Sequence, residues 1–113
     1  MKQVDTISVS ELSTMAERMY GDLVKAVVDL ARGLLVVDAE LHVDEEQYLL
    51  EIGSRQRDLW GINLHPGKYG TADFIEFDSM VNIRPSQNNL SRGVEDPATR
   101  QQVIELISRM VSP

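Results

Sequence analysis

Cysteine is absent from this chain of 113 residues. The absence excludes disulfide bonds, thiolate nucleophiles and zinc sites built from cysteine, and it fits a reducing compartment. Long apolar runs are also absent, because the longest, Leu34 to Val37, is far too short to span a bilayer. The N-terminal stretch "MKQVDTISVSE" contains no apolar segment of signal-peptide length. We therefore expect a cytoplasmic protein with no membrane segment.

Positive charge is scarce relative to negative charge. The chain has 11 lysine and arginine residues but 18 aspartate and glutamate residues, so its formal net charge is −7. A surface of this sign repels phosphate backbones at long range, which disfavours nucleic acid as a partner. A small local basic pocket remains compatible with this balance.

The apolar content is sufficient for one hydrophobic core. Apolar residues make up 42% of the chain and charged residues 26%, which is the composition of a folded globular protein. Aromatic residues contribute only 5%, so we expect a core of Val, Ile, Leu and Met. The length suits a single globular domain over residues 1–113.

Capping signals predict the first and last helices. Ser8 and Glu11 form a capping box, which predicts a helix over residues 9–20. Asp96 followed by Pro97 predicts the start of the last helix, because aspartate caps well and proline loses nothing at the first helical position. Both segments carry apolar residues at helical spacing, as a helix packed on a core requires.

A shorter helix is predicted in the middle of the chain. Asp44 is its expected N-cap, and Gly53 is expected to end it. The apolar run is short, so a strand over residues 47–52 remains an alternative.

Several strands are predicted from apolar runs bounded by turn residues. The segment "LVKAVVDLARGLLVVD" predicts two strands around a tight turn at Gly33, and "DLWGINLHPG" predicts another. The segment "FIEFDSMVNI" predicts one bent strand or two short ones, with a bulge near Asp78 and Ser79. These elements predict an α+β fold: a four- or five-stranded antiparallel or mixed sheet, with about three helices packed mainly on one face.

A long polar stretch, "NIRPSQNNLSRGVEDP", separates the last strand from the last helix. It is longer than most connections, which favours a function for it. Arginine is suited to carboxylate or phosphate, and serine and asparagine add short polar groups. The predicted binding residues, for an anionic small molecule or a protein carboxylate, are Arg84, Ser86, Asn88, Ser91 and Arg92.

The same stretch also has a purely structural interpretation. Asp96 would cap the helix, an arginine would pair with Glu95 or another carboxylate, and Asn and Ser side chains would satisfy loop amides. The two interpretations differ in what they leave unpaired. A binding site requires Arg84 or Arg92 to face solvent or a cleft without a carboxylate beside it.

The stretch "ELHVDEE" places a histidine between carboxylates. If the backbone there is extended, Glu40 and His42 share a face and Asp44 can join them. Such a group could perform acid–base chemistry or hold a divalent metal, so these three are the candidate catalytic residues. The alternative is structural, with Asp44 as a helix cap. The spacing matches no zinc-hydrolase motif, so we assign no metal ligand and expect no cofactor.

Three segments together resemble a known protein family. They are "ELHVDEE", "GSRQRDLWGINLHPG" and "FIEFDSMVNIRPSQNNLSRGVEDP". In this order they are similar to a family of small bacterial proteins catalogued only as a domain of unknown function. The resemblance covers nearly the whole chain and implies a single-domain cytoplasmic bacterial protein. It implies no activity, so it assigns no catalytic residue.

Three functions from different classes are compatible with the sequence. We favour a binding module that uses the Arg/Ser/Asn-rich loop. The second is a metal-assisted or acid–base hydrolase that uses Glu40, His42 and Asp44. The third is an acidic interaction partner; if the strand Leu34 to Val37 lies at a sheet edge, it could pair across a homodimer.

Overall fold

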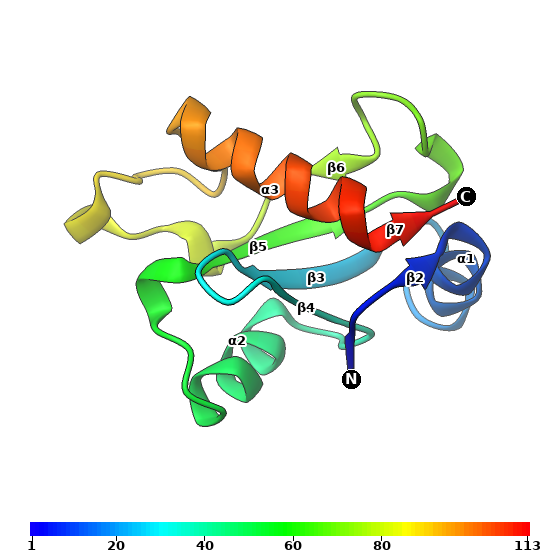
Figure 1. Cartoon of the computed structure of the whole chain (residues 1–113), viewed down its shortest axis with the longest axis horizontal. Coiled ribbons are helices and arrows are strands. Elements are labelled where there is room, and N and C mark those ends of the chain that lie inside the picture. Colours follow the sequence, from blue (N-terminus) through cyan, green and yellow to red (C-terminus); the bar gives the residue numbers. More distant parts are fainter.

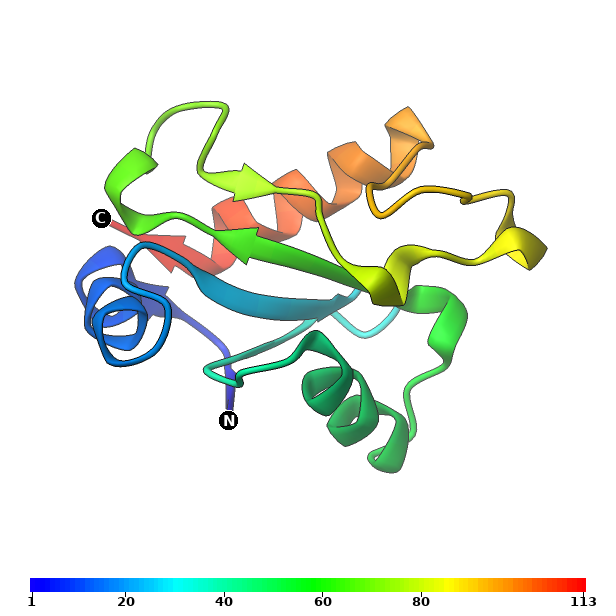
Figure 2. The ribbon, with the colours of Figure 1, turned by 180° about the vertical axis from the view of Figure 1, so that it is seen from behind.

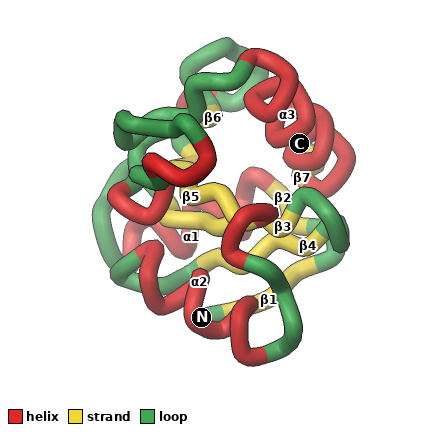
Figure 3. The backbone as a smooth tube through the Cα atoms, turned by 90° about the vertical axis from the view of Figure 1, so that its left-hand side faces the viewer, coloured by secondary structure: helices red, strands yellow, loops and turns green.

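The computed structural model describes residues 1–113 and contains a five-stranded sheet with helices on both faces (Figure 1). All neighbouring strands are antiparallel, in the order β1-β4-β3-β5-β6, which Figure 3 shows from bottom to top. The strands are β1 (Lys2–Val4), β4 (Leu34–Val37), β3 (Val24–Asp29), β5 (Leu59–Leu64) and β6 (Ile75–Glu76). This architecture confirms the predicted α+β class.

The α-helices divide between the two faces of the sheet. Helices α1 (Val9–Arg18) and α3 (Pro97–Met110) pack on the larger core, whereas α2 (His42–Glu51) packs on the opposite face. Alternate residues of β3 face opposite sides, so Ala26 belongs to the larger core and Val27 to the smaller one. Figure 1 shows α3 above the sheet and α2 below it. None of the three has the length and apolar composition that crossing a membrane requires.

Two short strands near the ends of the chain pair beside α1. Strand β2 (Ile7–Ser8), just before α1, pairs in parallel with β7 (Val111–Ser112), just after α3. Ile7 and Val111 are both buried in the larger core. The pairing therefore fixes the start of α1 relative to the end of α3.

Local capping starts α1 and α3 where the sequence predicts. The main-chain amide of Glu11 donates to Ser8 Oγ at 3.1 Å, and the amide of Ser8 donates to Glu11 Oε1 at 3.3 Å. The Thr99 amide donates to Asp96 Oδ2 at 3.0 Å, with Pro97 at the first helical position. Both predicted starts are confirmed, although α1 ends at Arg18 rather than at residue 20.

The predicted hairpin is formed by β3 and β4. Gly33 has a φ of 65° in the turn, and the Arg32 amide donates to Asp29 Oδ1 at 3.0 Å. However, β4 pairs with β1 on its other side and is an interior strand. The condition for dimer pairing through Leu34–Val37, a free sheet edge, is therefore not met.

The middle helix starts earlier than predicted. Helix α2 begins at His42 with Leu41 as its N-cap, and no side chain caps it, so Asp44 is not the capping residue. The imidazole Nε2 of His42 lies 2.7 Å from the main-chain oxygen of Ile62. This buried contact with β5 fixes the first residue of the helix, a tertiary interaction that local capping preferences cannot predict.

The strand predicted over "FIEFDSMVNI" is much shorter than expected. Only Ile75 and Glu76 form β6, and the short 3-10 helix η3 (Met80–Asn82) follows instead of a bulged strand. The side chain of Ser79 accepts the amide of Val81 and starts this turn. The outer edge of the sheet is therefore only partly covered by a strand.

Helix α2 carries an unusual buried acid. The side chain of Glu45 is fully buried, and neither of its carboxyl oxygens has a hydrogen-bond partner. Burial raises the pKa of Glu45 from 4.5 to about 10, and the nearby main chain of Ala39 opposes the shift only in part. Glu45 is therefore neutral in the folded protein at pH 7 but ionised in the unfolded chain.

Replacing this acid should stabilise the protein. Because the pKa of Glu45 is higher in the folded state, its contribution to the free energy of unfolding is fully present below pH 4.5. This contribution is lost as pH rises toward 10, since the unfolded chain ionises first. We expect Glu45→Gln to raise the free energy of unfolding at pH 7 by about 1–3 kcal/mol and to flatten its decline between pH 5 and 9. Urea unfolding across this pH range measures both effects. Glu51→Gln, at an exposed position of α2, is the control; equal pH profiles for the wild type and Glu45→Gln would contradict the expectation.

Candidate functional site

The polar stretch between β6 and α3 is called the edge loop here (residues 77–96). It includes η3, and its part between η3 and α3 extends at the right of Figure 2. Strand β6 pairs only with Asn63 and Leu64, so the first half of β5 has no strand on its outer side. Its main-chain groups still require partners, because buried N–H and C=O groups are rarely left unpaired. Side chains of the edge loop supply these partners.

Asn82 replaces a strand at this position. Its Oδ1 accepts the Gly61 amide at 2.8 Å, and its Nδ2 donates to the Gly61 main-chain oxygen at 2.9 Å. Nδ2 also donates to the main-chain oxygen of Arg92 at 3.0 Å. Position 61 has no room for a side chain, because a Cβ there would lie 2.6 Å from Ser79 Oγ. The edge loop therefore packs directly on the backbone of β5.

Arg84 continues the same edge and is buried. Its guanidinium donates to the main-chain oxygens of Gln56, Leu59 and Val81, the last at 3.1 Å. It also lies over the ring of Trp60, 4.3 Å from the ring centre. Burial lowers the pKa of Arg84, and no carboxylate forms an ion pair with it. The protein's own carbonyl groups hold this arginine, so we leave it out of the proposed binding residues.

Asn89 and Glu95 organise the interior of the edge loop. Asn89 Nδ2 donates to the main-chain oxygen of Asn82 at 2.7 Å, and its Oδ1 accepts the Glu95 amide at 2.9 Å. The Glu95 carboxylate accepts the amides of Leu90 at 2.7 Å and Ser91 at 2.8 Å. These hydrogen bonds lower the pKa of Glu95. The loop is therefore folded by its own polar side chains, as the structural interpretation predicts.

The remaining predicted binding residues of the loop are more exposed. Ser86 and Asn88 lie in the outer turn, where Asn88 has a left-handed φ of 58°. The Ser91 hydroxyl accepts a main-chain amide within the loop. Arg92 pairs with Asp78, rather than Glu95, and its side chain remains 52% exposed. Of the two arginines, only Arg92 is exposed, but Asp78 lies beside it, so neither arginine meets the condition stated above for a binding site in the loop.

The candidate catalytic residues do not form one group. Because α2 begins at His42, the backbone is not extended through these residues as the prediction assumed. Glu40 and Asp44 line an exposed hollow on one side of α2, whereas His42 is buried against Ile62. Burial lowers the pKa of His42, so its imidazole is neutral at pH 7. No three His, Asp or Glu side chains in the structure lie together so that they could hold a metal ion.

The stretch "ELHVDEE" and the edge loop nevertheless both contribute residues to one surface pocket of about 450 Å³. We call it the α2–η3 pocket, because it lies between the start of α2 and η3. Arg92 enters it from the edge loop and His42 from α2. Its lining residues are Lys25, Leu41, His42, Val43, Ser79, Met80, Val81 and Arg92.

Lys25 is the charged lining residue that sequence reasoning missed. It forms no ion pair, and its ammonium group lies 5.2 Å from the centre of the Tyr20 ring. The signal was present in the sequence, because Lys25 is the one cation in the apolar strand β3 and sits on the face opposite Val24 and Ala26. Alternation alone could not show that Arg92 approaches the same face.

These features define a small α+β domain whose antiparallel sheet is completed by a polar loop and carries a cation-lined pocket beside it. The chain belongs to a family described as "Protein of unknown function (DUF5674)", whose sequence profile matches residues 3–110. The match confirms the resemblance to an uncharacterised family. No curated protein and no solved structure matches the chain.

The role of Asn82 as a substitute strand is testable. Asn82→Ala leaves the N–H and C=O of Gly61 unpaired, and we expect it to lower the free energy of unfolding by about 2–4 kcal/mol. Ser86→Ala, in the exposed turn of the same loop, should change it by less than about 0.5 kcal/mol. Urea unfolding monitored by circular dichroism measures both. A similar small effect for the two variants would show that the edge loop does not complete the sheet.

Proposed function

We propose that this protein is a binding module that recognises an anionic group, a carboxylate or a phosphate, in the α2–η3 pocket. The observation that carries the proposal is the presence of Lys25 and Arg92 in one pocket of a chain with a net charge of −7. Lys25 has no ion-pair partner, so its charge is available to a ligand. Arg92 adds a second cation, although Asp78 offsets part of its charge.

The start of α2 supports the same polarity. Leu41 and His42 line the pocket, and no side chain caps the first turn of this helix. The amino end of a helix favours negative charge, because its free N–H groups and the helix dipole both attract anions. The pKa of His42, lowered mainly by burial, is lowered further by Lys25 and Arg92 and raised by Asp78, so these charges act on the same site.

The rim of the pocket is apolar. Leu41 is 51% exposed, Val43 50% and Met80 69%. Exposed apolar residues grouped on one part of a surface are typical of sites that bind another molecule. We infer that the anionic group is carried on an apolar body, either a small organic acid or an acidic side chain of a protein partner.

The other two functions have less support. Glu40 and Asp44 lie apart from His42, so the hydrolase has no assembled catalytic group. Dimer formation through β4 would require a free edge, and β4 is paired on both sides. The binding module therefore remains the function that we propose.

The proposal is tested by thermal unfolding with added phosphate or succinate. A ligand that prefers the folded state stabilises it by about 2.7 kcal/mol at 100 times its dissociation constant. We expect at least one of these anions to raise the midpoint, and both Lys25→Ala and Arg92→Ala to abolish the rise. Arg57→Ala, an exposed arginine of the 3-10 helix Gln56–Asp58, should retain it. A flat response to both anions, or an equal rise in all variants, would overturn the proposal.

A further inference from the structure

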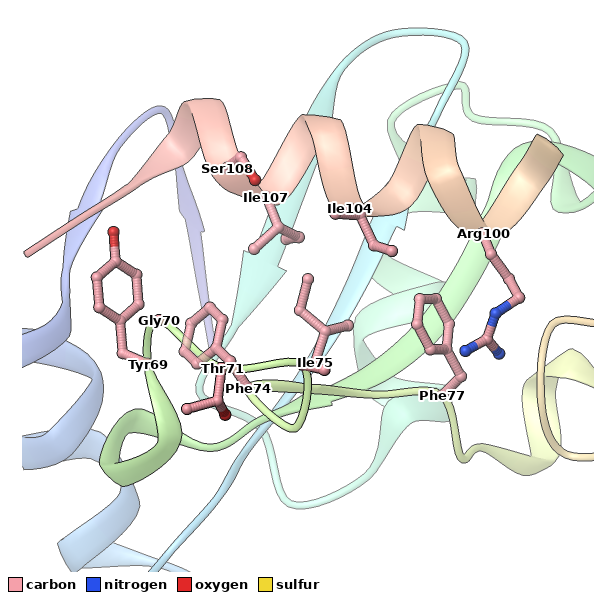
Figure 4. Close-up of a pocket in the computed structure, with 11 residues that line it drawn as sticks. Tyr69, Gly70, Thr71, Phe74, Ile75, Phe77, Arg100, Ile104, Ile107 and Ser108 are labelled. Carbon is pink, nitrogen blue, oxygen red and sulfur yellow. The ribbon is translucent and has the colours of Figure 1, made fainter. Parts of the chain in front are cut away.

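A second concave site lies on the opposite face of the sheet. A groove of about 440 Å³ opens between α3 and the segment that leads into and out of β6 (Figure 4). We call it the α3–β6 groove. Its volume lies within the range of pockets that bind small organic molecules. It shares no lining residue with the α2–η3 pocket.

The middle of the groove is apolar. Phe74 and Ile107 belong to the larger core, and Ile75 and Ile104 are only partly buried beside it. Figure 4 shows these four side chains in the space between α3 and the chain of β6. The groove opens here because β6 forms the edge of the sheet, so no further strand continues the surface beneath α3.

One end of the groove carries its only charge, the guanidinium of Arg100. This group lies 4.1 Å from the centre of the Phe77 ring and has one long contact, 3.4 Å, with the main-chain oxygen of Val94. Arg100 forms no ion pair, and no acidic residue lines the groove, although the chain contains 18 acidic residues. The other end carries the hydroxyl groups of Tyr69 and Ser108 (Figure 4).

We propose that the α3–β6 groove binds a monocarboxylate with an apolar body, with its carboxylate on Arg100. A guanidinium without a carboxylate partner pairs well with the two oxygens of such a group. The apolar walls accept a hydrocarbon chain but disfavour a second charge, because an unpaired charge there would lose its hydration. The charge pattern of the groove therefore favours an amphipathic acid over a dicarboxylate.

The length of the groove limits the ligand. Arg100 and Ser108 lie at its two ends on α3, and eight residues of helix extend about 12 Å, comparable to an extended chain of about ten carbons. Decanoate is therefore a suitable probe. Its carboxylate would contact Arg100, and its methyl end would approach Ser108.

The test compares decanoate, decanol and decylamine, each below its aggregating concentration, with the full-length protein. Two-dimensional NMR should show decanoate-dependent shifts at residues of the groove, and titration calorimetry should show tighter binding of decanoate than of the other two. Arg100→Gln should weaken decanoate about tenfold or more while leaving decanol unchanged. Ser108→Phe places a ring at an exposed position that lines the groove. This variant should abolish the binding of decanoate and of decanol.

Two control variants distinguish this site from other cationic groups. Arg109→Gln, an exposed arginine on α3 outside the groove, should bind decanoate as the wild type does. Lys25→Ala should also retain decanoate binding, so failure of the α2–η3 pocket would not affect this result. Equal affinities for decanoate and decylamine, unchanged affinity in Arg100→Gln, or no groove shifts with decanoate would each overturn the proposal.

Discussion

The outer edge of β5 is the constraint on which much of this structure depends. Strand β6 covers only the end of β5, and the remaining main-chain groups cannot be left without partners in a buried position. Asn82 satisfies both polar groups of Gly61, and Arg84 satisfies the oxygen of Leu59. Side chains of a polar loop therefore make the hydrogen bonds that a neighbouring strand would make. This role accounts for the length and polarity of the stretch.

This constraint changes how the composition of the loop is understood. Arginine and asparagine are suited to binding ligands, but their ability to make several hydrogen bonds in fixed geometry also suits them to satisfying main-chain groups. In this protein Arg84 and Asn89 bind the chain itself. Arg92 differs, because its side chain remains half exposed beside the α2–η3 pocket.

The edge loop also positions both proposed sites. Its first part packs on Gly61 and carries η3, which forms one wall of the α2–η3 pocket. Its last part leads into α3, whose first turns place Arg100 over Phe77 at one end of the α3–β6 groove. The two sites lie on opposite faces of the sheet and share this one segment as a support. Loss of the loop's hydrogen bonds would therefore affect both.

Local interactions determined what the sequence could predict. The capping box at Ser8, the Asp96 cap and the hairpin turn at Gly33 each depend on residues within a few positions of one another. The alternation and apolar content of the segments likewise predicted the α+β class. In the folded protein these apolar residues are buried between the sheet and the helices.

Tertiary structure decided the start of α2, the length of β6 and the role of Arg84. The contact of His42 with Ile62 and the bond of Arg84 to Leu59 join residues 20 and 25 positions apart. The meeting of Lys25 and Arg92 in one pocket, and of Arg100 with the apolar groove, depends on packing across the sheet. The sequence contains these residues but not their proximity, because contacts between distant segments form only when the whole core is assembled.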